Sequence, residues 1–131
     1  MYSAITKDIE VTVTPRFVPE RSSPDNGYFF WAYTINIANK GSETVQLKTR
    51  HWRIVDATGK EQEVRGAGVV GEEPLLKPGE SYEYTSGVPL PTPSGFMQGS
   101  YGMIRTDDRA NFDIEIPAFS LDSSYATRTI N

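Results

Sequence analysis

The amino-acid sequence predicts an all-β protein, an antiparallel β-sandwich of about seven strands. Short segments in which apolar and polar residues alternate recur along the chain, and turn-forming residues separate them. No segment has the spacing of three and four between apolar residues that an amphipathic helix requires. The chain has 131 residues and no cysteine, so we expect one domain, residues 1–131, without a disulfide.

The first strand is predicted at Lys7–Val18. Ile9, Val11 and Val13 alternate there with polar residues, which is the period of a half-buried strand. Pro15 interrupts the pattern, and a proline lacks the amide that a strand ladder uses. We therefore expect an edge strand, or a strand that changes its partner at Pro15. Such an edge is a candidate for pairing with another protein.

The central core strand is predicted at residues 28–38, after a loop rich in turn-forming residues at 19–27. Its alternation is the clearest in the chain. One face carries Phe29, Trp31, Tyr33, Ile35 and Ile37. Residues 39–42 supply the turn that follows.

The next strand, predicted at residues 43–56, changes its alternation part-way. Val45 and Leu47 share one face, whereas Trp52 lies at a position of the opposite parity. A β-bulge near residues 49–51 would return the apolar side chains to one face. The alternative is a strand that is covered on both faces.

Four further strands are predicted in the second half of the chain. A short one at residues 61–65 precedes a long glycine-rich connection at 66–79. The strand at 81–86 directs its two tyrosines inward, and a proline-rich segment at 88–95 follows it.

The last two strands form a predicted hairpin. Alternation returns at residues 96–106, and residues 107–111 form the loop. The final strand is predicted at residues 112–116, and Pro117 is expected to end it. The polar composition of residues 122–131 predicts a flexible tail.

Two positions narrow the sandwich to an immunoglobulin-like or fibronectin type III-like fold. Trp52 falls on the third predicted strand, where immunoglobulin-like sandwiches place a buried tryptophan. Tyr101 stands two residues before Met103, as the tyrosine-corner residue stands before the second cysteine of such domains. The core predicted between the two sheets includes Trp31, Tyr33, Ile35, Trp52, Ile54, Tyr101 and Met103.

Charge and hydropathy argue against several classes of function. The 17 acidic and 13 basic side chains give a net charge of −4, which disfavours a general nucleic-acid binder. The first residues lack a basic segment followed by an apolar run, and no window approaches the roughly 20 apolar residues of a membrane span. We therefore predict a cytoplasmic protein without a membrane or nucleic-acid partner.

Three segments taken together resemble the bacterial ApaG family. They are VQLKTRHWRIVDATG at residues 45–59, EVRGAGVVGEEPLLKPGESYEYTSG at 63–87 and TPSGFMQGSYGM at 92–103. Unusual strings such as Arg50-His51-Trp52 occur in the family's order and at its separations, and the likeness covers nearly the whole chain. The resemblance implies a fibronectin type III-like fold and no established enzymatic activity.

The same resemblance implies a role in interactions between proteins. The family was named for genetic linkage to diadenosine tetraphosphate hydrolysis, and one bacterial branch is associated with cobalt tolerance and magnesium efflux. Eukaryotic relatives occur as domains of F-box proteins and of a DNA-polymerase-interacting protein. We therefore expect a non-enzymatic protein-interaction module without catalytic residues or cofactors. The alternative is binding, or weak hydrolysis, of a nucleotide or pyrophosphate.

The candidate binding site is a glycine-rich loop at residues 66–73. It spells G-x-G-x-x-G with Gly66, Gly68 and Gly71. In dinucleotide-binding folds, this motif places a pyrophosphate at a helix N-terminus. Here the carboxylates of Glu72 and Glu73 follow the motif and no helix is predicted, so contact with a protein partner is the preferred interpretation.

Two uses of this loop therefore stay open. In the first, Val69 and Val70 contact a protein partner. The acidic pair Glu72 and Glu73 would favour a partner with a basic surface. Adjacent side chains of an extended segment point in opposite directions, so at least one valine should be exposed. In the second, the loop amides form an anion-binding nest. The candidate basic supports for that nest are Arg50, His51, Arg53 and Arg65.

The one histidine, His51, lies in a basic segment between Arg50 and Arg53. A single histidine without cysteine does not assemble an ordinary transition-metal site, nor a general base with its orienting partner. We predict a hydrogen-bonded structural histidine, with anion contact as the alternative. The glutamates of the middle third match no calcium-binding loop, so no metal site is predicted.

Overall fold

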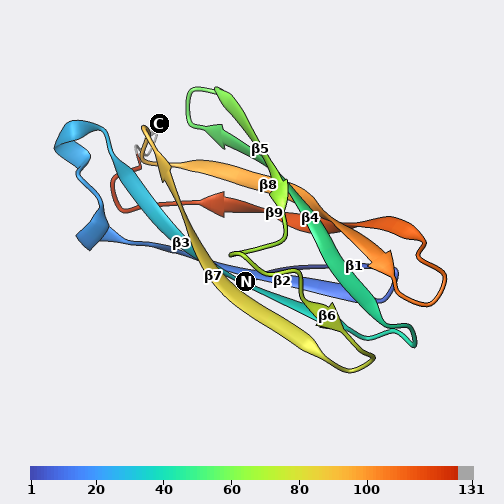
Figure 1. The fold of residues 1–131 in the computed structure, drawn as a ribbon. Helices are drawn as coiled ribbons and strands as arrows, with labels where there is room; N and C mark the ends of the chain where they lie inside the picture. Colours follow the sequence, from blue (N-terminus) through green and yellow to red (C-terminus); the bar gives the residue numbers. More distant parts are fainter. Residues whose placement is uncertain (127–131) are drawn as a thin grey trace.

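The computed structural model describes residues 1–126 and consists of two antiparallel sheets packed face to face (Figure 1). The first sheet has the order β1-β2-β3-β7, and its strands are Tyr2–Thr6 (β1), Ile9–Phe17 (β2), Phe29–Asn39 (β3) and Ser81–Leu90 (β7). The second has the order β5-β4-β8-β9, with β6 beside β4. Its strands are Val45–Asp56 (β4), Glu61–Ala67 (β5), Leu75–Leu76 (β6), Gly95–Arg105 (β8) and Asn111–Leu121 (β9). The predicted β-sandwich is confirmed.

All seven predicted strands are present in the described residues, and the structure adds β1 and β6. Strand β1 was not predicted from the sequence, because its apolar residues do not alternate and its Ile5 side chain is exposed. Two short 3-10 turns, Pro19–Arg21 (η1) and Pro24–Asn26 (η2), lie within the predicted loop before β3. None of the helical turns described is long and apolar enough to cross a membrane.

The core lies between the sheets and contains all seven predicted residues. Alternate residues of β3, from Phe29 to Asn39, are buried. Trp52 on β4 packs edge-to-face against Tyr33 on β3 and Phe119 on β9, with ring centroids 5.5 and 6.0 Å away. These aromatic contacts tie the centres of the two sheets together.

A β-bulge in β4 explains its change of alternation. The register between β4 and β8 shifts between Leu47 and Thr49, so Lys48 is the additional residue, just before the predicted position. Beyond the bulge, Arg50 and Trp52 face the interior together. This inward direction of an arginine is the main consequence of the bulge for the functional site.

The prolines behave differently from expectation. Strand β2 is not an edge strand over its first half, because β1 pairs with it from Ile9 to Val13. Pro15 lies beyond this pairing, where only β3 is beside it. The prediction that Pro117 ends the last strand is wrong. A register shift between β8 and β9 accommodates it in a bulge, and the strand continues to Leu121.

Two tyrosines connect the sheets elsewhere. The Tyr101 hydroxyl on β8 is hydrogen-bonded to the Tyr84 hydroxyl on β7. It therefore bonds a side chain of the opposite sheet, instead of the backbone as in the predicted tyrosine corner. Strand β7 also continues to Leu90, through the start of the segment predicted as a proline-rich loop, because an edge strand tolerates Pro89.

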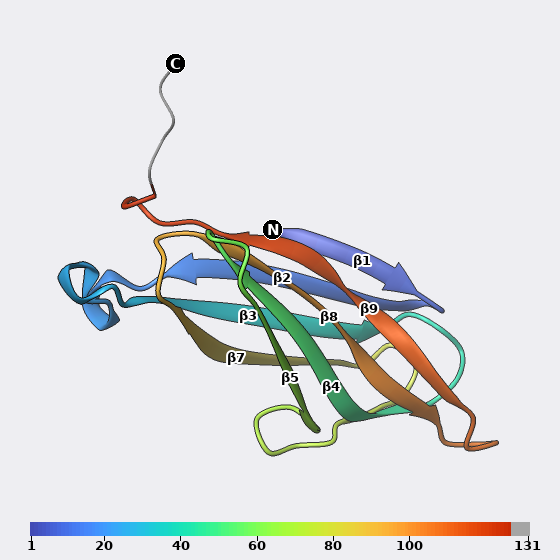
Figure 2. The same ribbon diagram turned by 90° about the horizontal axis from the view of Figure 1, so that it is seen from above.

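The two long edges of the sandwich differ. At one edge, β9 packs beside β1 and β2, whereas β5 and β7 lie at the other (Figure 2). After β9, the Asp122 carbonyl accepts a hydrogen bond of 2.8 Å from Trp31 Nε1, and the Tyr125 ring packs against Phe17. The rest of the predicted tail, residues 127–131, lies outside the described residues.

Candidate functional site

The tip of the glycine-rich loop is a tight hairpin turn. Val69 and Glu72 exchange two backbone hydrogen bonds of 2.8 Å around Val70 and Gly71. Val70 has φ +42° and Gly71 has φ +81°. Positive φ at both central residues is the requirement of a type I′ turn, which favours asparagine and glycine there.

The two adjacent valines have opposite environments. Val69 is 1% exposed and belongs to the core, whereas Val70 is 54% exposed. The prediction that at least one valine is exposed is confirmed. The prediction that Val69 contacts a partner at the surface is wrong, because the hairpin turns its side chain toward the interior. Val70 is the apolar group that the loop displays.

Gly68 is required by the path of the chain. Its φ is +62°, and a Cβ built there would lie 2.3 Å from the Glu72 carbonyl oxygen. Its amide donates a hydrogen bond of 2.9 Å to the Lys48 carbonyl, at the bulge of β4. The glycine thus lets the two sides of the loop approach closely.

Arg50 supports the loop from the inside. Its Nη1 donates hydrogen bonds of 2.9 and 3.0 Å to the carbonyls of Ala67 and Gly68. The guanidinium lies against Gly66, where a Cβ would be 2.7 Å from Cζ. The contact that the sequence suggested for Arg50 therefore exists, but it is made to loop carbonyls.

Three amides of the loop already donate hydrogen bonds to backbone carbonyls. Gly68 donates to Lys48, and Val69 and Glu72 donate to each other's carbonyls. An anion nest built from these amides would have to replace bonds that hold the turn closed.

The other basic candidates face carboxylates on β5. Arg53 Nε is 2.7 Å from Glu61 Oε2, and this pair raises the pKa of Arg53 and lowers that of Glu61. His51 Nε2 lies 3.2 Å from Glu63 Oε2, and Arg65 also pairs with Glu63.

Arg53 therefore pairs with β5 and does not fold over the loop, whereas Arg65 pairs with Glu63 and lines a shallow hollow with Arg50, His51 and Gly66. Strand pairing places the acidic residues of β5 opposite the basic segment of β4, which the separation in sequence concealed. At the other end of the loop, Glu73 Oε1 forms a 2.7 Å salt bridge with Lys48. Within residues 1–126, no group of three histidine or acidic side chains is arranged to hold a metal ion.

A cavity opens between the edge strands β5 and β7, and we call it the open-edge cavity. Its volume is about 340 Å³. The lining consists of Tyr33, Arg50, Trp52, Ile54, Gln62, Val64, Val69, Val70, Tyr84, Ser86, Gly87, Val88, Pro89 and Met97. The sequence did not predict this site, because the cavity depends on how far apart the edge strands β5 and β7 of the two sheets lie.

Comparison with known proteins identifies the family. Residues 19–105 match the family model described as the ApaG domain. This chain belongs to the ApaG family. A Protein ApaG from Afipia carboxidovorans is 63% identical over 131 residues, which cover 100% of both chains. A Protein ApaG from Rhodospirillum centenum is 59% identical over 125 residues, 95% of each chain.

Solved structures agree with this assignment. An ApaA protein of Bordetella pertussis has a TM-score of 0.86 and 48% identity, covering 91% of this chain and 96% of that chain. A second solved chain has a TM-score of 0.85 and 38% identity, covering 98% and 96%. The resemblance to ApaG drawn from three segments of the sequence is confirmed.

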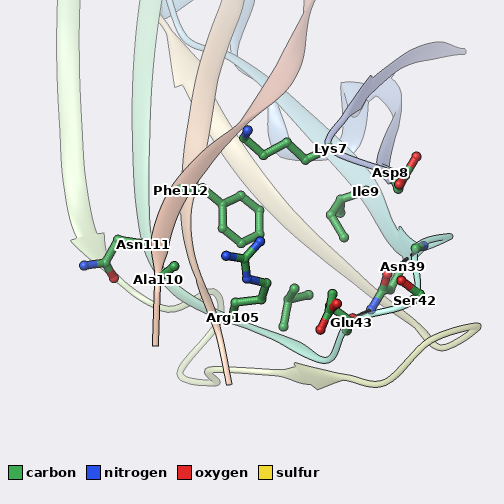
Figure 3. A pocket seen from close by; sticks show the side chains of 12 residues that line it. Lys7, Asp8, Ile9, Asn39, Ser42, Glu43, Arg105, Ala110, Asn111 and Phe112 are labelled. Carbon is green, nitrogen blue, oxygen red and sulfur yellow. Dashed lines mark hydrogen bonds between the residues drawn. The ribbon is translucent and has the colours of Figure 1, made fainter. Parts of the chain in front are cut away.

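The ApaG sandwich has a second cavity of about 410 Å³ at its far end (Figure 3). Figure 3 shows Arg105 beside the Phe112 ring, with Lys7 and Asp8 across the opening. Arg105 Nη2 is 2.7 Å from Asp108 Oδ2, and this pair lowers the pKa of Asp108 to about 2. Charges of both signs line this cavity and partly neutralise one another, so it presents no clear preference for a ligand.

Proposed function

We propose that this ApaG-family chain is a non-enzymatic protein-interaction module, and that its partner contacts Val70 at the tip of the 66–73 loop. The observation that carries the proposal is an exposed, β-branched residue held at φ +42° in a turn. Val69 beside it is buried, so the contact surface is narrower than the sequence predicted.

Valine is unfavourable at this position in the isolated domain. A β-branched residue in the left-handed region carries a strain of about 1–3 kcal/mol. Its exposed side chain also gains little from the hydrophobic effect. A partner that covered Val70 would recover the apolar burial, so the residue is better explained by a contact than by the fold.

The loop is also well anchored for recognition. Arg50 holds the Ala67 and Gly68 carbonyls, and Gln46 Nε2 donates a hydrogen bond of 3.0 Å to the Glu73 carbonyl. A surface that is ordered before binding loses less conformational entropy when the partner arrives.

The chemistry around Val70 favours a partner segment with an apolar residue and a nearby basic residue. The Glu72 carboxylate is exposed next to the turn. Glu73 is already paired with Lys48, so Glu72 supplies most of the available negative charge. Any link of the family to cobalt tolerance, magnesium efflux or dinucleoside polyphosphates would then pass through the partner.

The alternative is binding of a nucleotide or pyrophosphate through the glycine-rich loop. It is less favoured, because the amides of Gly68, Val69 and Glu72 already donate to carbonyls. Glu72 would also repel a phosphate.

The test compares partner capture by the wild-type protein and by Val70→Asn, which suits the turn and removes the apolar group. Ile5→Asn is the matched control, because Ile5 is equally apolar and exposed on the opposite edge. Proteins captured from a bacterial lysate are quantified by mass spectrometry. We expect a specific protein that is lost with Val70→Asn and retained with Ile5→Asn.

Equal capture by both variants would reject Val70 as the contact. A parallel assay incubates the purified protein with ATP, diadenosine tetraphosphate and pyrophosphate. Turnover, or saturable amide shifts confined to the glycines of the loop, would support the nucleotide alternative instead.

A further inference from the structure

We propose that the open-edge cavity is a binding site for a small apolar monocarboxylate, with Arg50 receiving the carboxylate. This inference goes beyond the proposed function and does not depend on it, because it rests on Arg50 and the wall around it, although Val70 of the loop tip also lines the cavity.

The first argument is the position of Arg50. The bulge at Lys48 turns Arg50 inward with Trp52, and the missing side chain of Gly66 leaves space for the guanidinium. In the cavity wall, Arg50 lies with the phenol-bearing residues Tyr33 and Tyr84. The protein therefore places a permanent positive charge at the boundary between its core and solvent.

The second argument is the absence of a counter-charge. Within residues 1–126, Arg50 forms no salt bridge, whereas Arg53 and Arg65 on the outer face each pair with a glutamate. Arg50 Nη1 is satisfied by two carbonyls, which are neutral. A half-buried cation without an anion is costly, and an anionic ligand would offset that cost.

The tyrosines around Arg50 do not supply that anion. Burial raises the pKa of Tyr33 and Tyr84, and the positive charge of Arg50 opposes this shift only in part. Burial likewise raises the pKa of Tyr101, which is hydrogen-bonded to Tyr84. All three phenols are thus neutral at physiological pH, and the hydroxyls of Tyr33 and Tyr84, which line the cavity, suit hydrogen bonds with a ligand.

The third argument is the shape and chemistry of the remaining wall. The volume of about 340 Å³ is within the range of small-molecule sites, which are mainly apolar with a few polar groups. Here Trp52, Ile54, Val64, Val88 and Met97 provide apolar surface, and the polar groups are few.

A carboxylate fits this arrangement better than a phosphate. Its two oxygens match the planar donors of one guanidinium, and a single charge is matched by a single cation. A phosphate dianion would bring excess negative charge into an apolar wall. The ligand class is therefore a small carboxylic acid with an aliphatic or aromatic body.

The test is a titration of the isotopically labelled full chain with phenylacetate, followed by NMR. Phenylacetamide is the neutral control of the same shape, and inorganic phosphate is the control for a simple anion. We expect saturable shifts of the Arg50 side-chain resonance and of the methyl groups of Val64 and Met97. Phenylacetamide should bind at least about tenfold more weakly than phenylacetate, because it forms no charge-assisted hydrogen bond.

Three variants locate the site. Arg50→Gln should abolish phenylacetate binding, and Ser86→Leu, which fills the cavity from β7 while Arg50 stays in place, should do the same. Arg53→Gln is the matched control, because it removes an exposed arginine of the same strand, and it should leave binding unchanged. The amide shifts of Gly68 and Val70 show whether the loop keeps its structure in each variant.

Several results would overturn the assignment. They are equal binding of the acid and the amide, binding that survives Ser86→Leu, comparable binding of phosphate at Arg50, and no saturable shift with phenylacetate.

Discussion

The Arg50 guanidinium lies against Gly66, so closely that a side chain at position 66 would begin 2.7 Å from Arg50 Cζ. Arg50 reaches this place because the bulge at Lys48 turns it inward. The same guanidinium holds the carbonyls of Ala67 and Gly68 and lines the open-edge cavity. One residue pair therefore connects the loop proposed to bind a partner with the cavity proposed to bind a carboxylate.

Gly68→Ala and Gly71→Ala should separate steric from conformational costs in the loop. Both glycines have positive φ, but a Cβ at Gly68 would meet the Glu72 carbonyl at 2.3 Å, whereas Gly71 has open space. We expect Gly71→Ala to lower the free energy of unfolding by about 1 kcal/mol and Gly68→Ala by roughly 2–4 kcal/mol. Urea denaturation measures both, and equal losses would contradict the close approach at Gly68.

Val70→Asn should stabilise the domain. Asparagine tolerates the left-handed conformation that Val70 adopts at φ +42°, so the substitution relieves strain at an exposed site. We expect the free energy of unfolding to rise by about 1 kcal/mol. Thermal and urea denaturation provide the measurement, with Ile5→Asn as the control at a position without positive φ. A loss of stability with Val70→Asn would show that the valine contributes to the fold itself.

Asp108→Asn should remove a pH-dependent contribution to stability. Arg105 lowers the pKa of Asp108 to about 2 in the folded protein, below the ordinary value of 3.8. The unfolded chain therefore binds more protons in this window, and the contribution is present above pH 3.8 and lost as the pH falls toward 2. The variant should be less stable than wild type at pH 6, with a difference that shrinks in acid. A difference that is independent of pH would exclude the ion pair as its cause.

Alkaline pH should destabilise the protein through its buried tyrosines. Burial raises the pKa of Tyr33, Tyr84 and Tyr101 above the ordinary value of 10.0. Because the unfolded chain releases these protons first, their contribution is complete below pH 10 and is lost as the pH rises above it. Absorbance of phenolate should show these tyrosines ionising only as the protein unfolds. Tyr84→Phe is expected to reduce the number of late-ionising groups, and full ionisation in the folded state would contradict their burial.

The sequence by itself determined the strands and the faces that they bury. Phe29, Trp31 and Tyr33 alternate along β3, and burial of one face follows directly from the two-residue period of a strand. At least one of Val69 and Val70 is exposed, as expected, but a tight turn and not an extended segment separates their side chains. These features are local, because they depend on residues close together in the chain.

Only the tertiary structure decided the chemistry of the site. Pairing of β4 with β5 brought Glu61 and Glu63 beside Arg53 and His51, so the predicted basic segment faces carboxylates. Glu63 also pairs with Arg65 of its own strand. The alternation indicated a bulge, but whether its extra residue was Lys48 or a residue one to three positions later depended on the register with β8. That register sends Arg50 inside, and the separation of β5 and β7 leaves the cavity beside it. Contacts between distant segments set register and edge spacing, so no periodicity within one segment could specify them.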